Sequence, residues 1–186
     1  MEELRRWEVI ATEPLQDCRV FRVSRVFTRS PHSEQVHPFY RIDSADWVNV
    51  VPLTAGGQVA MVRQYRHGSR DHSLEIPGGL VDPGENPADA AARELLEETG
   101  FSAAKLRLIG SLNPNPALFG NRVHTFLAED AVPAGEIQNG ETEQTVLELV
   151  PAAEIPAKLR AGEIDHALVI AALHWWALDR ECAGGG

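Results

Sequence analysis

The N-terminal part of the chain alternates between apolar and polar positions with the period of a β-strand. In the segment 18–29, Phe21 and Val23 alternate with polar neighbours, and the segment 7–12 has a similar character. A turn rich in serine and proline separates these segments from further predicted strands at 39–42, 47–53, 58–64 and 74–76. This half of the chain is therefore expected to be mostly β-structure.

One strong helix is predicted between Asn86 and Thr99. Asn86 is a suitable N-cap, Pro87 suits the first turn, and Gly100 closes the end. Later strands are predicted at 106–111, 123–128 and 146–150, and later helices at 155–161 and 167–179. Because strands outnumber helices and do not alternate with them regularly, the pattern favours an α+β fold over a doubly wound sheet.

Composition narrows the possible partners. The chain has 186 residues, 44% of them hydrophobic, and a formal charge of −10, so one main domain is expected and duplex nucleic acid is a poor partner. A small anionic substrate stays compatible, because a local arginine cluster and a bound cation can reverse the field in a cleft. Cys18 and Cys182 suggest reduced thiols, and no apolar run approaches the ~18 residues of a membrane span. We therefore expect a cytoplasmic protein without membrane partners.

Three glutamates share one face of the predicted helix. At about 100° per residue, Glu97 and Glu98 lie within roughly 60° on either side of Glu94. Clustered carboxylates repel one another unless a positive charge offsets them, and a hard divalent cation is a natural partner. The glycine-rich loop 78–85 before the helix allows sharp turns or close approach of the backbone to a ligand.

The spacing of these residues distinguishes a metal site from an acidic helix face that is only exposed to solvent. The segment 79–101 fits the pattern G-x5-E-x7-R-E-U-x-E-E-x-G-U, where U is a bulky apolar residue, at every fixed position. At roughly 7% per residue type, such agreement has a chance on the order of 10⁻⁸ per start position. The segment resembles the Nudix box, with Phe101 standing where an aliphatic residue is commoner.

This resemblance implies a metal site. The glutamates that match Glu94 and Glu98 are principal metal ligands in the Nudix family, and the match of Glu97 is a further ligand or supports them. The carbonyl of the residue before the box, here Gly78, is a ligand in some members. Mg²⁺ is thus the expected cofactor, with Mn²⁺ as a substitute.

The resemblance also assigns the remaining motif positions. The arginine that matches Arg93 orients the carboxylates, so Arg93 and Glu97 are counted among the catalytic residues. The glutamate that matches Glu85 stabilises the loop and helix, and Gly79 and Gly100 complete the structural motif.

Outside the box, the chain resembles the ADP-ribose and nucleoside-diphosphate-sugar pyrophosphatase branch over roughly residues 47–179. The resemblance rests on the segment VRQYRHG before LEIPGGLVDPGE, on the prolines Pro114 and Pro116, and on the C-terminal segment AGEIDHALVIAALHWWAL. This branch implies an α/β/α sandwich with a mixed sheet and metal-dependent hydrolysis of a diphosphate to NMP and a sugar phosphate. The loop 113–122 departs from the Ser-Pro-Gly stretch of many ADP-ribose enzymes, which keeps other nucleoside-diphosphate sugars open.

Enzymes of this branch often place the catalytic base, or another metal ligand, in a loop well after the box. In the loop 135–144, Glu141 is the predicted base and Glu143 the predicted metal-linked residue, the alternative being two exposed loop glutamates. Arginine suits bidentate phosphate contacts, so Arg66, Arg63 and Arg122 are the predicted substrate-binding residues. The alternative for Arg66 is a surface ion pair.

The expected organisation has three parts. Residues 1–45 form a β-rich segment that helps to build a homodimer, 46–180 form the Nudix hydrolase domain, and 181–186 form a flexible tail. His166 is expected to serve helix packing or a dimer surface. Two other functions stay open: a Nudix hydrolase of nucleoside triphosphates, dinucleoside polyphosphates or capped RNA, and a non-catalytic ligand sensor. The intact box argues against a sensor, which has no need of every metal carboxylate.

Overall fold

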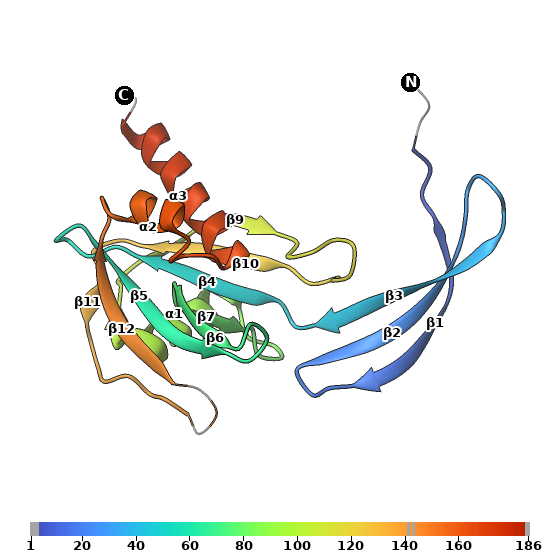
Figure 1. Cartoon of the computed structure of the whole chain (residues 1–186), viewed down its shortest axis with the longest axis horizontal. Coiled ribbons are helices and arrows are strands. Elements are labelled where there is room, and N and C mark those ends of the chain that lie inside the picture. The colour runs from blue at the N-terminus through green and yellow to red at the C-terminus, as the bar shows by residue number, and fades with distance from the viewer. Residues whose placement is uncertain (1–3, 141, 143, 185–186) are drawn as a thin grey trace. The chain divides into compact units, whose positions relative to one another are not determined.

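The computed structural model describes residues 4–140, 142 and 144–184 (Figure 1). Its strands are β1 (Glu8–Asp17), β2 (Phe21–Arg29), β3 (Val36–Ser44), β4 (Trp47–Pro52), β5 (Gln58–Arg66), β6 (Asp71–Glu75), β7 (Gly78–Leu80), β8 (Phe101–Ser102), β9 (Leu106–Leu112), β10 (Val123–Ala128), β11 (Val132–Pro133) and β12 (Thr145–Pro151). Its helices are α1 (Pro87–Thr99), α2 (Ile155–Ala161) and α3 (Ala167–Gly184). The chain forms two compact units, an N-terminal unit of residues up to 45 with 113–122, and a main unit of 46–112 with 123 onward.

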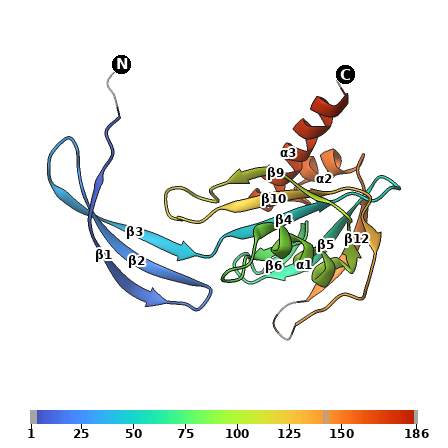
Figure 2. The same ribbon diagram turned by 180° about the vertical axis from the view of Figure 1, so that it is seen from behind.

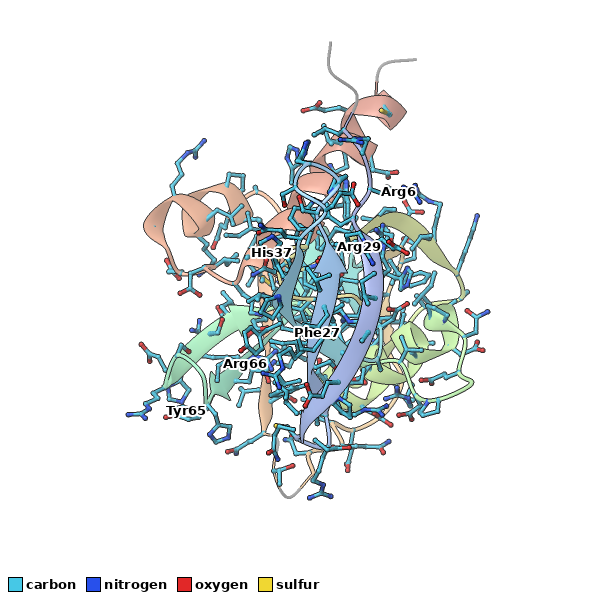
Figure 3. The ribbon with its side chains drawn as sticks, turned by 90° about the vertical axis from the view of Figure 1, so that its right-hand side faces the viewer. Arg6, Phe27, Arg29, His37, Tyr65 and Arg66 are labelled. Atoms are coloured by element: carbon cyan, nitrogen blue, oxygen red, sulfur yellow. The ribbon has the colours of Figure 1, made fainter. Side chains whose placement is uncertain are left out.

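The N-terminal unit is an antiparallel sheet with the order β1-β2-β3. Strand β1 is longer than predicted and includes Pro14. Its pairing with β2 shifts register between Val9 and Ala11 and again between Pro14 and Gln16, as at β-bulges. Strand β3 contains Pro38, which an edge strand tolerates. Figure 3 labels Phe27 and Arg29 on β2 and His37 on β3.

The loop 113–122 belongs to this N-terminal unit through backbone and side-chain hydrogen bonds. The Ile42 amide donates to the Leu118 carbonyl over 2.8 Å. The Asn121 side-chain amide donates to the Ala45 carbonyl over 2.9 Å. Sequence reasoning did not associate this loop with the N-terminal strands, because the contact joins segments far apart along the chain.

The main unit contains a mixed sheet. Strands lie in the order β7-β4-β10-β9, with β10 parallel to β4 and the other pairs antiparallel. A second antiparallel group has the order β12-β5-β6. The prediction of an α+β fold with a mixed sheet is confirmed.

Helices cover both faces of these strands, as the views from front and back show (Figures 1 and 2). On one side, Val48 and Val50 of β4 pack with Leu95 of α1. On the other side, Val51 packs in a cluster with Trp176 of α3. Alternate residues of a strand point to opposite faces, so β4 contributes to both clusters and the unit has three layers, α/β/α.

Further elements differ from the sequence-based expectation, among them the short strands β8 and β11, which were not predicted. Strand β7 was not predicted, because its two glycines carry no strand signal, yet it pairs with β4 between Trp47 and Asn49. Helix α3 continues to Gly184, into the segment expected as a flexible tail. Within the described part of the chain, no helix has the length and apolar character needed to cross a membrane.

Candidate active site

Helix α1 carries the acidic motif and has well-defined ends. The Asn86 side chain accepts a hydrogen bond from the Ala88 amide over 2.9 Å, and Pro87 occupies the first turn. Gly100 has a φ of 71° and its amide donates to the Leu96 carbonyl. A Cβ on Gly100 would also stand 2.5 Å from the Gly135 carbonyl oxygen, so the helix end requires glycine for conformation and for space.

Arg93 connects the loop before the helix to the carboxylates on it. Its guanidinium donates to both oxygens of Glu85, at 3.0 Å each, and to Glu94 at 2.8 Å and Glu97 at 3.3 Å. It also donates to the Leu80 carbonyl over 3.1 Å. The hydrogen bonds that Arg93 donates to Glu85, and then to Glu94, raise the pKa of Arg93, and the same bonds to Glu85 lower the pKa of Glu85. Arg93 therefore fixes the mutual position of three motif glutamates.

Glu98 lies on the same helix and is 5% exposed. Its Oε2 accepts a hydrogen bond from the Gly78 amide over 2.8 Å, and its backbone carbonyl accepts one from the Thr145 hydroxyl over 3.1 Å. Helix α1, strand β7 and strand β12 thus meet at this residue. A carboxylate so deeply buried needs strong compensation for its charge.

Gly79 allows the loop backbone to approach Glu94. A Cβ at this position would stand 2.3 Å from Oε1 and 2.5 Å from the carboxyl carbon of Glu94. The first glycine of the motif is therefore required by close packing against a candidate metal ligand.

The donor set at α1 suits a hard cation. Glu94, Glu97 and Glu98 offer carboxylate oxygens and Gly78 offers a carbonyl, which are the ligand types that Mg²⁺ prefers. Among the residues that the structure describes, no three acidic, histidine or cysteine side chains already converge as a metal site. In this structure Glu94 and Glu97 are ion-paired with Arg93.

Arg66, at the end of β5, forms a bidentate ion pair with Glu75 of β6, with N–O distances of 2.7 and 2.8 Å. The Glu75 side chain is 3% exposed and that of Arg66 is 41% exposed. Burial by itself raises the pKa of Glu75, but the hydrogen bonds and charge of Arg66 outweigh it and hold the pKa below its ordinary value. Arg63 donates from two nitrogens to one oxygen of the partly exposed Glu148, at 2.9 and 3.2 Å.

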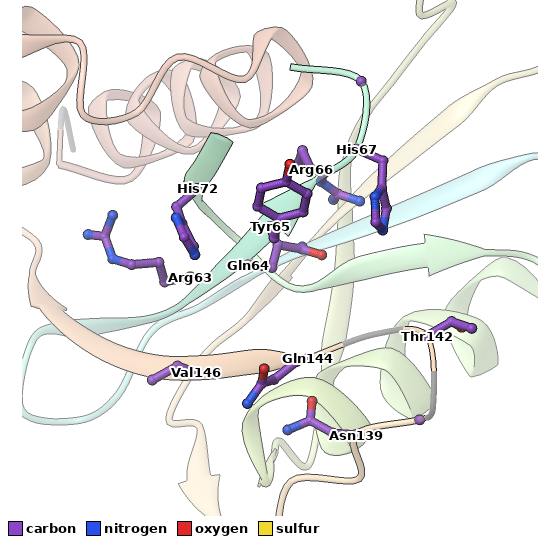
Figure 4. A pocket seen from close by; sticks show the side chains of 12 residues that line it. Arg63, Gln64, Tyr65, Arg66, His67, His72, Asn139, Thr142, Gln144 and Val146 are labelled. Carbon is purple, nitrogen blue, oxygen red and sulfur yellow. The ribbon is translucent and has the colours of Figure 1, made fainter. Parts of the chain in front are cut away.

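A larger cleft of about 1130 Å³ lies between strand β5 and the loop before β12 (Figure 4). Tyr65, Arg66 and His67 line one side, and Asn139, Thr142 and Gln144 line the other, as Figure 4 shows. The Tyr65 ring meets the rings of His67 and His72 edge to face, with centroids 5.2 and 5.7 Å apart.

A smaller cleft of about 310 Å³ lies beside the start of the motif, and Arg66 lines both clefts. Its lining includes Gly78 and Gly79 of β7, Glu75, Asn49 and Trp47. His166, expected to serve helix packing or a dimer surface, also lines this cleft.

Most of the predicted site residues lie in the main unit. The motif residues Gly78, Gly79, Glu85, Arg93, Glu94, Glu97, Glu98 and Gly100, with Arg63 and Arg66, all lie in the main unit. Arg122 belongs to the N-terminal unit. Glu141 and Glu143 lie outside the described residues, although the neighbouring Gly140 and Thr142 line the larger cleft.

Glu75 and Asn49 are two of the cleft residues that sequence reasoning missed. Glu75 was not singled out, although a charged residue inside the apolar run before Pro77 was an available signal. Asn49 was also overlooked, although it is a polar residue inside the apolar strand 47–53. Buried polar residues in strands usually have a specific partner.

Comparisons with known proteins agree with this geometry. A family model described as the NUDIX domain matches residues 43–173. An ADP-ribose pyrophosphatase of Mycobacterium tuberculosis (strain ATCC 25618 / H37Rv) is 31% identical over 168 residues, covering 89% of this chain and 80% of the relative. The ADP compounds hydrolase NudE of Escherichia coli (strain K12) is 29% identical over 133 residues, covering 71% of each chain.

A solved structure described as an ADP compounds hydrolase has the same fold. It superposes with a TM-score of 0.86 and covers 99% of both chains at 24% sequence identity. The mixed sheet, the three layers and the complete acidic motif on α1 are all present in this chain. This chain belongs to the Nudix hydrolase family.

Proposed function

We propose that the chain hydrolyses the diphosphate linkage of ADP-ribose or a related nucleoside-diphosphate sugar, releasing NMP and a sugar phosphate. The observation that carries this proposal is the arrangement on α1, where Arg93 holds Glu85, Glu94 and Glu97 together beside the buried Glu98. Relatives named ADP-ribose pyrophosphatase and ADP compounds hydrolase support the choice of substrate class.

The proposed cofactor is Mg²⁺, with Mn²⁺ as a substitute. Glu94, Glu98 and the Gly78 carbonyl would hold it, with Glu97 as a further or supporting ligand. When bound, such a cation neutralises charge on the phosphate oxygens and acidifies water. Arg93 keeps Glu94 and Glu97 in place through direct hydrogen bonds, and Glu98 is kept in place by the Gly78 amide.

The other site residues have proposed roles in binding and proton transfer. Arg66 would contact the diphosphate, and its place on both clefts supports this role. Arg63 and Arg122 are proposed as further substrate contacts. Glu141 is proposed as the general base and Glu143 as a metal-linked residue, because they flank Thr142 in the loop that lines the larger cleft.

A substrate panel tests the proposal. ADP-ribose, ADP-glucose, GDP-mannose, UDP-glucose and a dinucleoside polyphosphate are incubated with the protein and excess phosphatase, with and without Mg²⁺. Phosphate release then reports cleavage of these substrates. Cleavage of dGTP is measured separately by chromatography, because phosphatase itself attacks dGTP. Mg²⁺-dependent cleavage of a diphosphate sugar is expected. Preferential cleavage of dGTP or the polyphosphate would move the specificity to another Nudix class, and no cleavage at all would favour a ligand sensor.

We also propose that residues 1–45 help to form a homodimer of a cytoplasmic enzyme. Every residue of β1 is exposed, and large apolar side chains of this sheet, among them Val9, Ile10 and Tyr40, remain on the surface. Exposed apolar surface of this kind is typical of an interaction site. Light scattering on the purified chain tests the proposal, and a monomer at micromolar concentration would refute it.

A further inference from the structure

His166 lies directly before helix α3 and caps that helix with one of its two ring nitrogens. Its Nδ1 accepts a hydrogen bond from the Leu168 amide over 3.2 Å, and its backbone carbonyl accepts one from the Ile170 amide over 3.0 Å. This is the hydrogen-bonding pattern of a helix N-cap. Because Nδ1 accepts, it carries no proton, and the proton of the neutral ring is on Nε2.

The second ring nitrogen, Nε2, is a hydrogen-bond donor that the described part of the chain does not use. The bond at Nδ1 is the only hydrogen bond that the His166 side chain makes with a described residue. The buried polar side-chain atoms that lack a partner among these residues do not include Nε2. This nitrogen therefore keeps contact with solvent, although the residue as a whole is half-buried.

The His166 ring lies in the smaller cleft, which Glu75 and Arg66 also line. Burial raises the pKa of Glu75 and Arg66 lowers it, and a charge interaction with His166 adds to the lowering, so the imidazole lies near the Glu75 carboxylate. The Asn49 side chain donates to the Leu168 carbonyl over 3.4 Å, which holds the first turn of α3 against β4 at the same cleft. Since Nδ1 is engaged by the helix, Nε2 is the nitrogen with which His166 can bind a ligand in this cleft.

Arg66 and His166 together offer one ligand a charged donor and a neutral donor. Both Glu75 oxygens accept from Arg66, so the carboxylate charge is offset within the cleft wall. The Arg66 side chain stays 41% exposed. Donors of this kind suit the oxygens of a phosphate, each of which accepts more than one hydrogen bond. Gly78 and Gly79 line the same cleft, so a phosphate there would lie beside the start of the acidic motif.

Capping alone does not require a histidine at this position. Serine, threonine, aspartate and asparagine are the preferred N-caps, because a short side chain already reaches the amide. The imidazole of His166 supplies the same acceptor and adds a donor on the other side of the ring. The additional donor is the feature that a role in helix packing leaves unexplained.

We propose that His166 Nε2 donates a hydrogen bond to a phosphate oxygen of the substrate in the smaller cleft, next to Arg66. His166 is thus a substrate-binding residue that the cap holds in position. This inference rests on the proposed function, because it assumes that the substrate carries a diphosphate.

Two substitutions separate the roles of the two ring nitrogens. His166→Asn keeps a short acceptor for the Leu168 amide but has no donor at the position of Nε2. His166→Gln carries an amide nitrogen on a longer side chain, which replaces the Nε2 donor, but lacks the short acceptor. His174→Asn is the matched control, because His174 is an exposed histidine of the same helix and lines neither cleft. Binding of ADP-ribose and of ADP to the full chain is measured by titration calorimetry in EDTA, so that turnover does not interfere, and Tm is measured on the same samples.

His166→Asn is expected to weaken the binding of both ligands on the order of tenfold, because a hydrogen bond to a charged oxygen is lost, and to keep the wild-type Tm. His166→Gln is expected to bind both ligands within about threefold of the wild type, and to lose about 2 to 4 °C in Tm because the cap is lost. His174→Asn is expected to change neither affinity nor Tm.

Unchanged affinity in His166→Asn would leave His166 as a helix cap only and would overturn the inference. Weaker binding of ADP-ribose alone would place the contact on the sugar instead of a phosphate, and would overturn it as well. The same holds if His166→Gln binds no better than His166→Asn, or if the wild type binds neither ligand.

Turnover of ADP-ribose with Mg²⁺, measured on the same samples, separates this inference from the proposed function. Loss of binding in His166→Asn with rescue in His166→Gln, but without turnover by the wild type, would support the phosphate contact and refute the hydrolase assignment. Turnover by the wild type with unchanged binding in His166→Asn would do the reverse.

Discussion

The Arg66 guanidinium is held by both oxygens of the Glu75 carboxylate, at 2.7 and 2.8 Å, in the wall that the two clefts share. Glu75 is buried while Arg66 is partly exposed, so the carboxylate fixes the guanidinium and the guanidinium faces the clefts. An arginine fixed in this way is pre-organised for a phosphate contact.

Glu75→Gln is expected to lower the free energy of unfolding at pH 7 by about 1 to 2 kcal/mol, because Arg66 loses a charged partner but stays partly solvated. The pKa of Glu75 is lowered in the folded protein, below 4.5. Its contribution is therefore fully present above pH 4.5 and is lost as the pH falls through the folded-state pKa. Urea denaturation at pH 7 and pH 3.5 measures this. An equal difference between variant and wild type at both pH values would contradict the assignment.

Gly79→Ala tests the close contact between the loop and Glu94. The added Cβ would stand 2.3 Å from Glu94 Oε1, so the carboxylate must move while the backbone stays unstrained. Turnover is expected to fall about 10- to 100-fold, with a higher Mg²⁺ requirement and little change in Tm. Gly56→Ala is the control, since its Cβ would meet only the Thr54 hydroxyl, at 3.8 Å. Wild-type kinetics in Gly79→Ala would show that Glu94 need not be held there.

Glu141→Gln tests the proposed base. A general base contributes about 10²- to 10⁴-fold, so kcat is expected to fall by this factor while KM changes little. The control is Glu136→Gln, an exposed glutamate in the same loop. Unchanged kcat in Glu141→Gln would assign proton transfer to another residue, and steady-state kinetics on ADP-ribose decide between these outcomes.

The sequence was most informative where the determining chemistry is local. Helix α1 was predicted from end to end, because Asn86, Pro87 and Gly100 set its limits through contacts within a few residues. The i,i+4 pair of Arg93 with Glu97 follows from helical spacing alone and is present in the structure.

Long-range features could not be derived in this way. The pair between Arg66 and Glu75 depends on the β5–β6 register, and strand β7 exists because β4 offers it a partner edge. Likewise, the burial of Asn49 depends on α3 packing over β4, which brings Leu168 within reach of its amide. Tertiary pairing of this kind is not encoded in any short window of sequence.

The most direct test of the central claim is ADP-ribose hydrolysis by wild type and Glu98→Gln, with products separated by chromatography and Mg²⁺ varied. This substitution keeps the size of the side chain and an oxygen for the Gly78 amide, but removes the charge. We expect Mg²⁺-dependent conversion to AMP and ribose 5-phosphate by the wild type. Rates about 100- to 1000-fold lower are expected in a variant with unchanged circular dichroism, since several kcal/mol of transition-state stabilisation are lost. Wild-type rates in Glu98→Gln, or turnover by the wild type that does not depend on Mg²⁺, would contradict the account.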